Sequence, residues 1–173
     1  MNISTTIEAP SKINVNEAAR KALDGAPDFS TAAKSLLKDA HRKPLLLAAL
    51  VKPVEWQAAM AAVRAANTSH RMAVWTAPTR ADLAEQADRA FVLADAMGDM
   101  LLDFPLPGGQ PLRSATKEDV TEAAEFYGLR ATNMAHKSRW MMKIAAKVPK
   151  GETVENMLDN VALIRMKKDT ENG

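Results

Sequence analysis

Apolar residues recur every three or four positions along most of this chain, which is the spacing of one face of an α-helix. The longest example alternates spacings of four and three without a slip. Its members are Val120, Ala124, Tyr127, Ala131, Met134, Ser138, Met141, Ala145 and Val148. This pattern predicts one helix of about thirty residues whose coiled-coil-like seam needs a partner surface.

The same spacing predicts helices on both sides of this seam. A short buried helix spans residues 44–51, an Ala-rich helix runs from 53 to about 75, and another runs from 79 to about 102. We expect the two longer ones to form an antiparallel hairpin. A last helix over 153–165 can fold back on the seam, and the polar tail 167–173 is expected to fray.

Helix starts are marked by capping pairs, in which a side chain that accepts a backbone N–H bond is followed three residues later by an acid. The acid also suits the positive end of the helix dipole. Three such pairs occur, Asn14 with Glu17, Thr79 with Asp82, and Thr116 with Asp119. Asp28 or Ser30 can cap a further short helix that ends near Ala40.

The stretch 104–115, with the sequence FPLPGGQPLRSA, interrupts the helical pattern. Its three prolines and the pair Gly108-Gly109 predict a tight turn with two very short extended arms. The turn marks a boundary between an N-terminal helical bundle, residues 1–103, and a C-terminal part, residues 104–173, made of the turn and the long-helix hairpin. The two parts can pack as one domain.

Composition strengthens the all-α prediction. The chain has 173 residues, of which 47% are hydrophobic but only 5% aromatic, so helix-forming Ala, Leu and Met fill the core. The absence of cysteine excludes disulfides, a thiolate nucleophile and a Cys-ligated zinc site. No apolar run is long enough for a membrane span and no secretory signal begins the chain, so we expect no membrane partner and a cytoplasmic location.

Charge is sorted along the chain. The total of 23 basic and 21 acidic residues gives a net charge of +2. The segments nevertheless carry +4 over 1–78 (10 basic, 6 acidic), −4 over 79–103 (2 basic, 6 acidic), +4 over 104–150 (8 basic, 4 acidic) and −2 over 151–173 (3 basic, 5 acidic). The near-neutral total therefore conceals basic and acidic surfaces.

A basic stripe lies opposite the apolar seam on the predicted long helix. It consists of His136, Arg139, Lys143, Lys147 and Lys150, with Trp140 at its edge. Cations in a row, beside an aromatic ring, are typical of a surface that follows a nucleic-acid backbone. A second basic group, Lys34, Lys38, His41, Arg42 and Lys43, supports this if both share one side of the fold.

A simpler interpretation of the stripe is a solvated helix face. Glu118, Glu122 and Glu125 precede the cations on the same face. A helix dipole favours this order, with acids near the N-terminal end of the helix and bases near its C-terminal end.

Carboxylates at helical spacing raise a third possibility, a Mg²⁺-dependent hydrolase. Glu152 and Glu155 resemble in outline the paired acids of all-α nucleoside triphosphate pyrophosphohydrolases, but the following pair, Glu155 and Asp159, is one residue too wide. The three histidines form no metal-ligand pair, and no phosphate-binding loop or nucleophile elbow occurs. We therefore assign no catalytic residue, metal or cofactor.

The C-terminal third contains a characteristic set of turn, cap and core positions, which are Gly108, Gly109, Leu112, Ala115, Thr116, Asp119, Pro149, Gly151, Thr153 and Val154. In these residues it resembles small uncharacterised helical proteins of alphaproteobacterial prophages and plasmids. Because the matching residues are turn, cap and core residues, the resemblance implies a shared helical hairpin without an activity.

The hypothesis favoured at this stage is a non-enzymatic, nucleic-acid-associated accessory or regulatory factor of a mobile element. The alternative is a helical protein-interaction module, because the Val120–Val148 seam is suited to a homo-oligomer or a partner helix.

Overall fold

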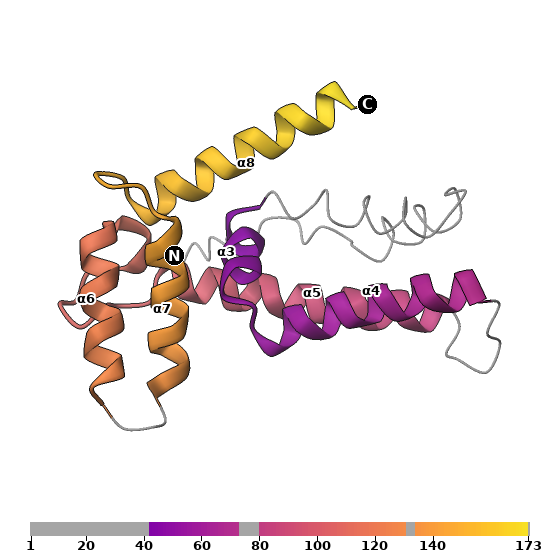
Figure 1. Ribbon diagram of the computed structural model, residues 1–173, viewed down its shortest axis with the longest axis horizontal. Helices are drawn as coiled ribbons and strands as arrows, with labels where there is room; N and C mark the ends of the chain where they lie inside the picture. The colour runs from indigo at the N-terminus through magenta and orange to yellow at the C-terminus, as the bar shows by residue number, and fades with distance from the viewer. Residues whose placement is uncertain (1–41, 73–79, 131–133, 173) are drawn as a thin grey trace, which may run out of the picture.

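The computed structural model describes residues 42–72, 80–130 and 134–172. In these ranges the protein is all-α, as predicted (Figure 1). The predicted capping pairs at Asn14 and Thr79, the helix ending near Ala40, and Lys34, Lys38 and His41 of the second basic group lie outside the described residues.

Helix α3 (Lys43–Val51) is the central element of the fold. Pro44 lies in its first turn, as predicted, and Leu45 to Ala48 are all buried. One apolar cluster contains Leu45 and Ala48 and extends over α4 and α5, and a second contains Leu47 and Val51 and extends over the C-terminal helices. A helix that is apolar on all sides therefore joins two cores.

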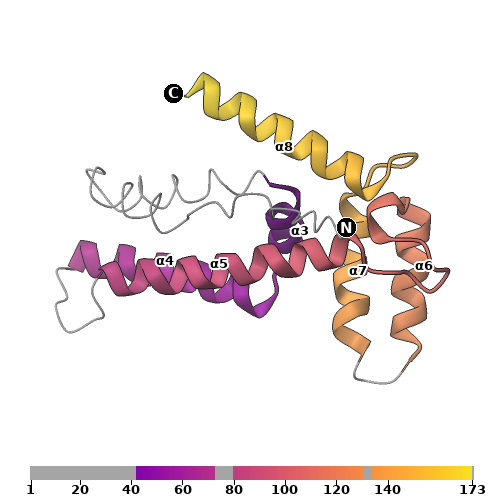
Figure 2. The ribbon, with the colours of Figure 1, turned by 180° about the vertical axis from the view of Figure 1, so that it is seen from behind.

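The predicted antiparallel hairpin is formed by α4 (Val54–Met72) and α5 (Arg80–Leu102), which lie side by side (Figures 1 and 2). The rings of Trp56 and Phe91 meet edge to face with centroids 5.2 Å apart, beneath α3. Lys52, in the left-handed conformation with φ 53°, turns the chain between α3 and α4, and the two helices meet at an angle of 89°.

Gly98 of α5 supports the close packing of α3. A Cβ at this position would lie 1.9 Å from the carbonyl oxygen of Pro44, so the two backbones meet where no larger side chain fits.

The turn after α5 has the two short extended arms that its sequence predicts. Pro105 and Pro111 form an isolated antiparallel bridge, and Gly109 has a φ of 87°. A short 3-10 helix, η2 (Leu112–Ser114), follows. The predicted boundary at residue 104 does not separate the cores, because Leu101 and Leu106, on either side of it, belong to the same apolar cluster.

The prediction of one helix from Val120 to Val148 is wrong. The chain forms α6 (Lys117–Gly128) and α7 (Ala135–Lys147), which pack together as a helical hairpin (Figure 1). Gly128 ends the first helix, and Leu129 beyond it is 89% exposed. Folding back lets the two halves of the seam bury each other, which a single extended helix cannot do without a partner.

The seam therefore becomes interior. Of its described members, Val120, Ala124, Tyr127, Ser138, Met141, Ala145 and Val148 are buried. The Ser138 hydroxyl donates to the Ala124 carbonyl at 2.8 Å and so satisfies the polar group at this position. The coiled-coil expectation loses its basis, because these residues are covered by the chain itself.

Helix α8 (Val154–Glu171) begins at the predicted cap, where the Thr153 hydroxyl accepts the backbone N–H of Asn156. Its first turns are buried through Val154, Met157 and Leu158. The predicted fraying from residue 167 is wrong, since the helix continues to Glu171 and extends away from α6 and α7 (Figures 1 and 2). Within the described ranges, no single helix has both the length and the apolarity to cross a bilayer.

The capping box at the start of α6 is confirmed. The Thr116 side chain accepts the backbone N–H of Asp119, and the Asp119 carboxylate accepts the backbone N–H of Thr116 at 2.9 Å. We expect Thr116→Ala to lower the free energy of unfolding by about 1 kcal/mol, measured by urea denaturation. Thr121→Ala, at an exposed position in the same helix, is the comparison, and equal losses would show that the cap adds nothing specific.

Candidate nucleic-acid interface

The outer face of α7 carries the predicted basic stripe. His136, Arg139, Lys143 and Lys147 are all exposed, and Lys150 continues the group in the turn beyond the helix. The opposite side of α7 is anchored in the core, where Met141 and Ile144 are 1% and 0% exposed. Burial of that side fixes the cations on the outside. We refer to these five residues as the α7 basic face.

Trp140 lies at the edge of this face and is half-buried against the core cluster. Its ring meets that of His136 edge to face, with centroids 5.1 Å apart. The neighbouring Lys137 is turned elsewhere, because its Nζ lies 5.2 Å from the ring centre of Phe104 and 5.8 Å from that of Tyr127. Lys137 is therefore engaged in cation–π contacts inside the fold.

Two lysines near this face bind backbone carbonyls at helix ends. Lys143 Nζ donates to the Val51 carbonyl at 3.3 Å, at the end of α3. Lys117 Nζ donates to the carbonyls of Ala145 (3.0 Å) and Val148 (3.4 Å), at the end of α7. Cations at these negative ends stabilise the helices, so Lys143 has a structural role as well as an exposed position.

The contact between Lys143 and Val51 adds a residue that sequence analysis missed. Lys52 follows Val51 in the chain and is exposed, so its backbone lies near Lys143 of the α7 basic face. No local signal indicates this, because the two lysines are 91 residues apart and only the packing of α3 on α7 brings them together.

Helix dipoles explain only part of the charge order once α6 and α7 are separate helices, since they favour Glu118 in the first turn of α6 and Lys147 in the last turn of α7. Glu125 is in the last turn of α6, and His136 and Lys137 are in the first turn of α7. These are the ends at which a dipole disfavours each sign of charge. Dipole order therefore accounts for Lys147 but not for Arg139 in the body of α7, and the interpretation of the stripe as a solvated helix face stays a prediction.

The described members of the second basic group are engaged elsewhere. Arg42 forms an ion pair with Asp95 of α5 at 3.4 Å. Burial raises the pKa of Asp95, the Arg42 charge opposes that rise, and the charge of Asp99 adds to it. One carboxylate oxygen of Asp95 is buried without a hydrogen bond. The positive charge of Arg42 therefore offsets part of the cost of burying the Asp95 carboxylate.

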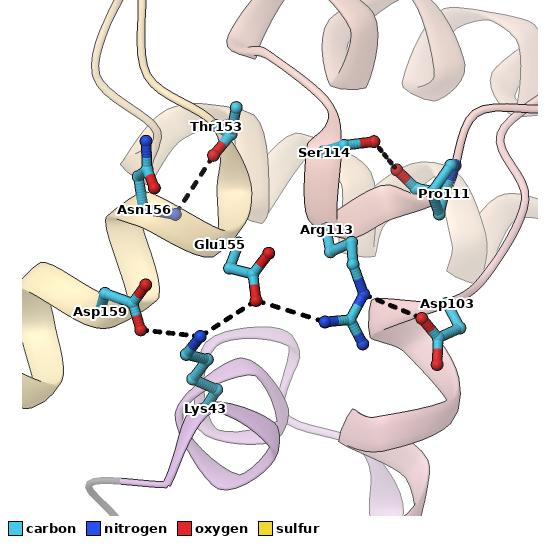
Figure 3. Close-up of polar contacts among 9 residues, drawn as sticks. All are labelled: Lys43, Asp103, Pro111, Arg113, Ser114, Thr153, Glu155, Asn156 and Asp159. Carbon is cyan, nitrogen blue, oxygen red and sulfur yellow. Dashed lines mark hydrogen bonds and ion pairs between the residues drawn. The ribbon is translucent and has the colours of Figure 1, made fainter.

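Lys43 belongs to a chain of ion pairs that joins α3, the residue that follows α5, η2 and α8 (Figure 3). Its Nζ lies 2.8 Å from Asp159 and 3.0 Å from Glu155, and hydrogen bonds to these two carboxylates raise its pKa. Glu155 also pairs with Arg113 at 3.2 Å, and Arg113 pairs with Asp103 at 2.9 Å.

These ion pairs neutralise both Lys43 and the acids of the hydrolase hypothesis, Glu155 and Asp159. In the ranges that the structure describes, no group of three or more His, Asp or Glu side chains is placed to hold a metal ion.

The two basic groups lie at opposite ends of α3. Lys143 contacts Val51 at the last residue of that helix, whereas Arg42 and Lys43 are at its start. A nine-residue helix separates its ends by about 13 Å. Because Arg42 and Lys43 also face carboxylates of this chain, the candidate interface rests on the α7 basic face together with Lys52.

No family model matches this chain, and no curated protein or solved structure was found to be similar to it.

Proposed function

We propose that this protein is a nucleic-acid-binding accessory or regulatory factor that contacts the phosphate backbone through the α7 basic face. The observation that carries the proposal is the set of exposed cations on one outer helix face. None of the ion pairs in the described part of the chain involves Arg139, Lys143, Lys147 or Lys150. Helix dipoles favour Lys147 in the last turn of α7 and Lys143 at the end of α3, but they give no reason for the position of Arg139.

The spacing of the cations suits a backbone contact. Arg139, Lys143 and Lys147 succeed one another by four residues, so their helix positions span about 12 Å. Cations in such a row displace counterions from several phosphates of one strand. Phosphate contacts carry no sequence information, so the proposed binding tolerates any sequence and depends strongly on salt.

The acids of α6 restrict binding to one side of the helical hairpin. Glu118, Glu122 and Glu125 are exposed on its outer face and would repel a phosphate backbone.

The resemblance of the C-terminal third to helical proteins of prophages and plasmids supports a role in a mobile element, where factors that handle nucleic acid are common partners of replication and transfer.

Salt dependence is the first test. With about four phosphates contacted, the affinity for a labelled duplex is expected to fall about 150-fold between about 50 and about 200 mM salt, which corresponds to a logarithmic slope near −3.6. Fluorescence anisotropy measures this directly. No binding at the lower salt concentration would contradict the proposal.

Charge reversal locates the interface. The double variant Arg139→Glu with Lys147→Glu is expected to weaken duplex binding at least about tenfold at low salt and to reduce the slope by about 2. Lys143 is kept, because it also binds the Val51 carbonyl. The matched control is Lys167→Glu with Lys168→Glu, which makes the same charge change at exposed positions of α8. Equal losses of affinity in both double variants would show that binding depends on the net charge of the protein rather than on the α7 basic face.

A further inference from the structure

The first two residues that the structure describes bind two different helices. Arg42 forms an ion pair with Asp95 of α5 at 3.4 Å, and Lys43, the next residue, pairs with Asp159 of α8 at 2.8 Å. The α4–α5 hairpin and α8 extend from α3 to the same side of the molecule (Figures 1 and 2). The chain that precedes Arg42 therefore approaches α3 beside both α5 and α8.

The side of α5 that binds Arg42 is acidic. Its members follow one another at intervals of four, three and four residues and so share one side of the helix. They are Asp88, Val92, Asp95 and Asp99, which we call the α5 stripe. Asp99 is exposed, and one oxygen of Asp95 is buried without a hydrogen bond from the described residues. Arg42 therefore supplies one positive charge against the two carboxylates of Asp95 and Asp99.

The side of α8 that binds Lys43 becomes apolar beyond the ion pair. Glu155, Asp159, Ala162 and Met166 repeat at the same intervals of four, three and four residues, so they share one side of this helix. Ala162 is partly buried against the core cluster, whereas Met166 is 51% exposed. An apolar surface thus continues along α8 from the point where Lys43 is bound.

The residues before Arg42 carry the side chains that suit these two surfaces. Lys34 and Lys38 lie eight and four residues before Arg42, and Leu36 lies between them. They lie outside the described residues, in the short helix that the sequence predicts to end near Ala40. At 100° per residue, Leu36 would be about 160° around that helix from both lysines. The sequence therefore predicts cations on one side of this segment and an apolar residue on the other.

We propose that residues 34–41 dock between the α5 stripe and α8, with Lys34 and Lys38 toward the carboxylates of α5 and Leu36 toward Met166. The ion pairs of Arg42 and Lys43 are the end of this interface that the structure describes. The proposal is independent of nucleic-acid binding, and it gives the second basic group a role within the protein.

Length and tethering favour this segment as the occupant. Met166 lies seven residues beyond Asp159, which is about 10 Å along α8, and the eight residues from Lys34 to Arg42 span about 12 Å as a helix. A segment that runs along α8 from Lys43 therefore reaches Met166. Because the segment belongs to the same chain, its effective concentration at this surface is high, and modest contacts suffice to hold it there.

A crosslink in the full chain tests the docking. The chain contains no cysteine, so Leu36→Cys with Met166→Cys introduces a single pair of thiols. A short bismaleimide is expected to join them within one molecule at least about ten times faster than it joins Leu36→Cys with Ile164→Cys. Ile164 is the matched control, because it is 53% exposed but lies about 160° around α8 from Met166. Equal rates for the two pairs, or no crosslink in either, would overturn the proposal.

Charge reversal tests the contact with α5. Added to the pair Leu36→Cys and Met166→Cys, the changes Lys34→Glu and Lys38→Glu are expected to slow crosslinking at least about fivefold, because they place acids against the α5 stripe. Lys12→Glu with Lys21→Glu makes the same charge change farther from α3 and should leave the rate unchanged. Equal slowing by both double changes would contradict the docking of the two lysines on α5. Mass spectrometry identifies the crosslinked peptides, and circular dichroism verifies that the variants are folded. No nucleic acid is present, so the result does not depend on the proposed function.

Discussion

Replacing Gly98 with alanine is expected to lower the free energy of unfolding by about 3 kcal/mol. In an ordinary helix interior the same change stabilises by about 1 kcal/mol, because alanine is the better helix former. Here the added Cβ would lie 1.9 Å from the Pro44 carbonyl oxygen and 2.6 Å from its carbonyl carbon. Both are backbone atoms, so α3 must move away from α5, and the two apolar clusters that meet at α3 lose contacts together.

Urea denaturation followed by far-UV circular dichroism measures this loss. Gly108→Ala is the matched control, since a Cβ at Gly108 would have no atom within 4 Å, and a change below about 0.5 kcal/mol is expected there. A stabilised Gly98→Ala variant would show that α3 does not pack on α5 at this distance. If Gly98→Ala does not accumulate as soluble protein while Gly108→Ala does, the steric argument is supported all the same.

Truncating Leu47 to alanine is expected to cost about 3 to 4 kcal/mol, because the side chain is completely buried and its removal leaves a cavity. Leu47 contributes to the C-terminal cluster, while Leu45 and Ala48 of the same short helix contribute to the cluster of α4 and α5. Loss of packing at Leu47 is therefore expected to destabilise both parts of the molecule.

Leu163→Ala is the comparison for this substitution, because Leu163 is 55% exposed on α8 and should cost less than about 1 kcal/mol. Coincident unfolding curves from Trp fluorescence and circular dichroism are expected for the parent, as a single cooperative transition requires. Two separate transitions, with only one of them shifted by Leu47→Ala, would contradict the view that α3 joins the clusters.

Much of the helical framework could be predicted from local signals. Pro44 lies in the first turn of α3, Thr116 and Asp119 form the capping box of α6, and Thr153 caps α8. These features involve residues within three or four positions of one another, so a sequence pattern contains all that is needed to recognise them. The turn between Phe104 and Ala115 was predictable for the same reason.

The candidate site was predictable only in part. The exposed cations of α7 follow from helical spacing, whereas the engagement of Arg42 and Lys43 with Asp95, Glu155 and Asp159 does not. The pair of Lys43 with Glu155 joins residues 112 positions apart. Helical spacing likewise gives no sign that the missing side chain of Gly98 is what lets α3 pack on α5.

The amino-acid pattern specifies the set of helices and the sorting of charge among them, because capping, turn formation and the spacing of apolar residues are local properties. Tertiary structure decided that the Val120–Val148 pattern bends into α6 and α7, that α3 joins two cores, and which cations remain exposed. The reason is that burial depends on the whole folded chain. A repeat of apolar residues needs a surface that covers it, but the repeat alone does not determine whether another molecule or the chain itself provides that surface.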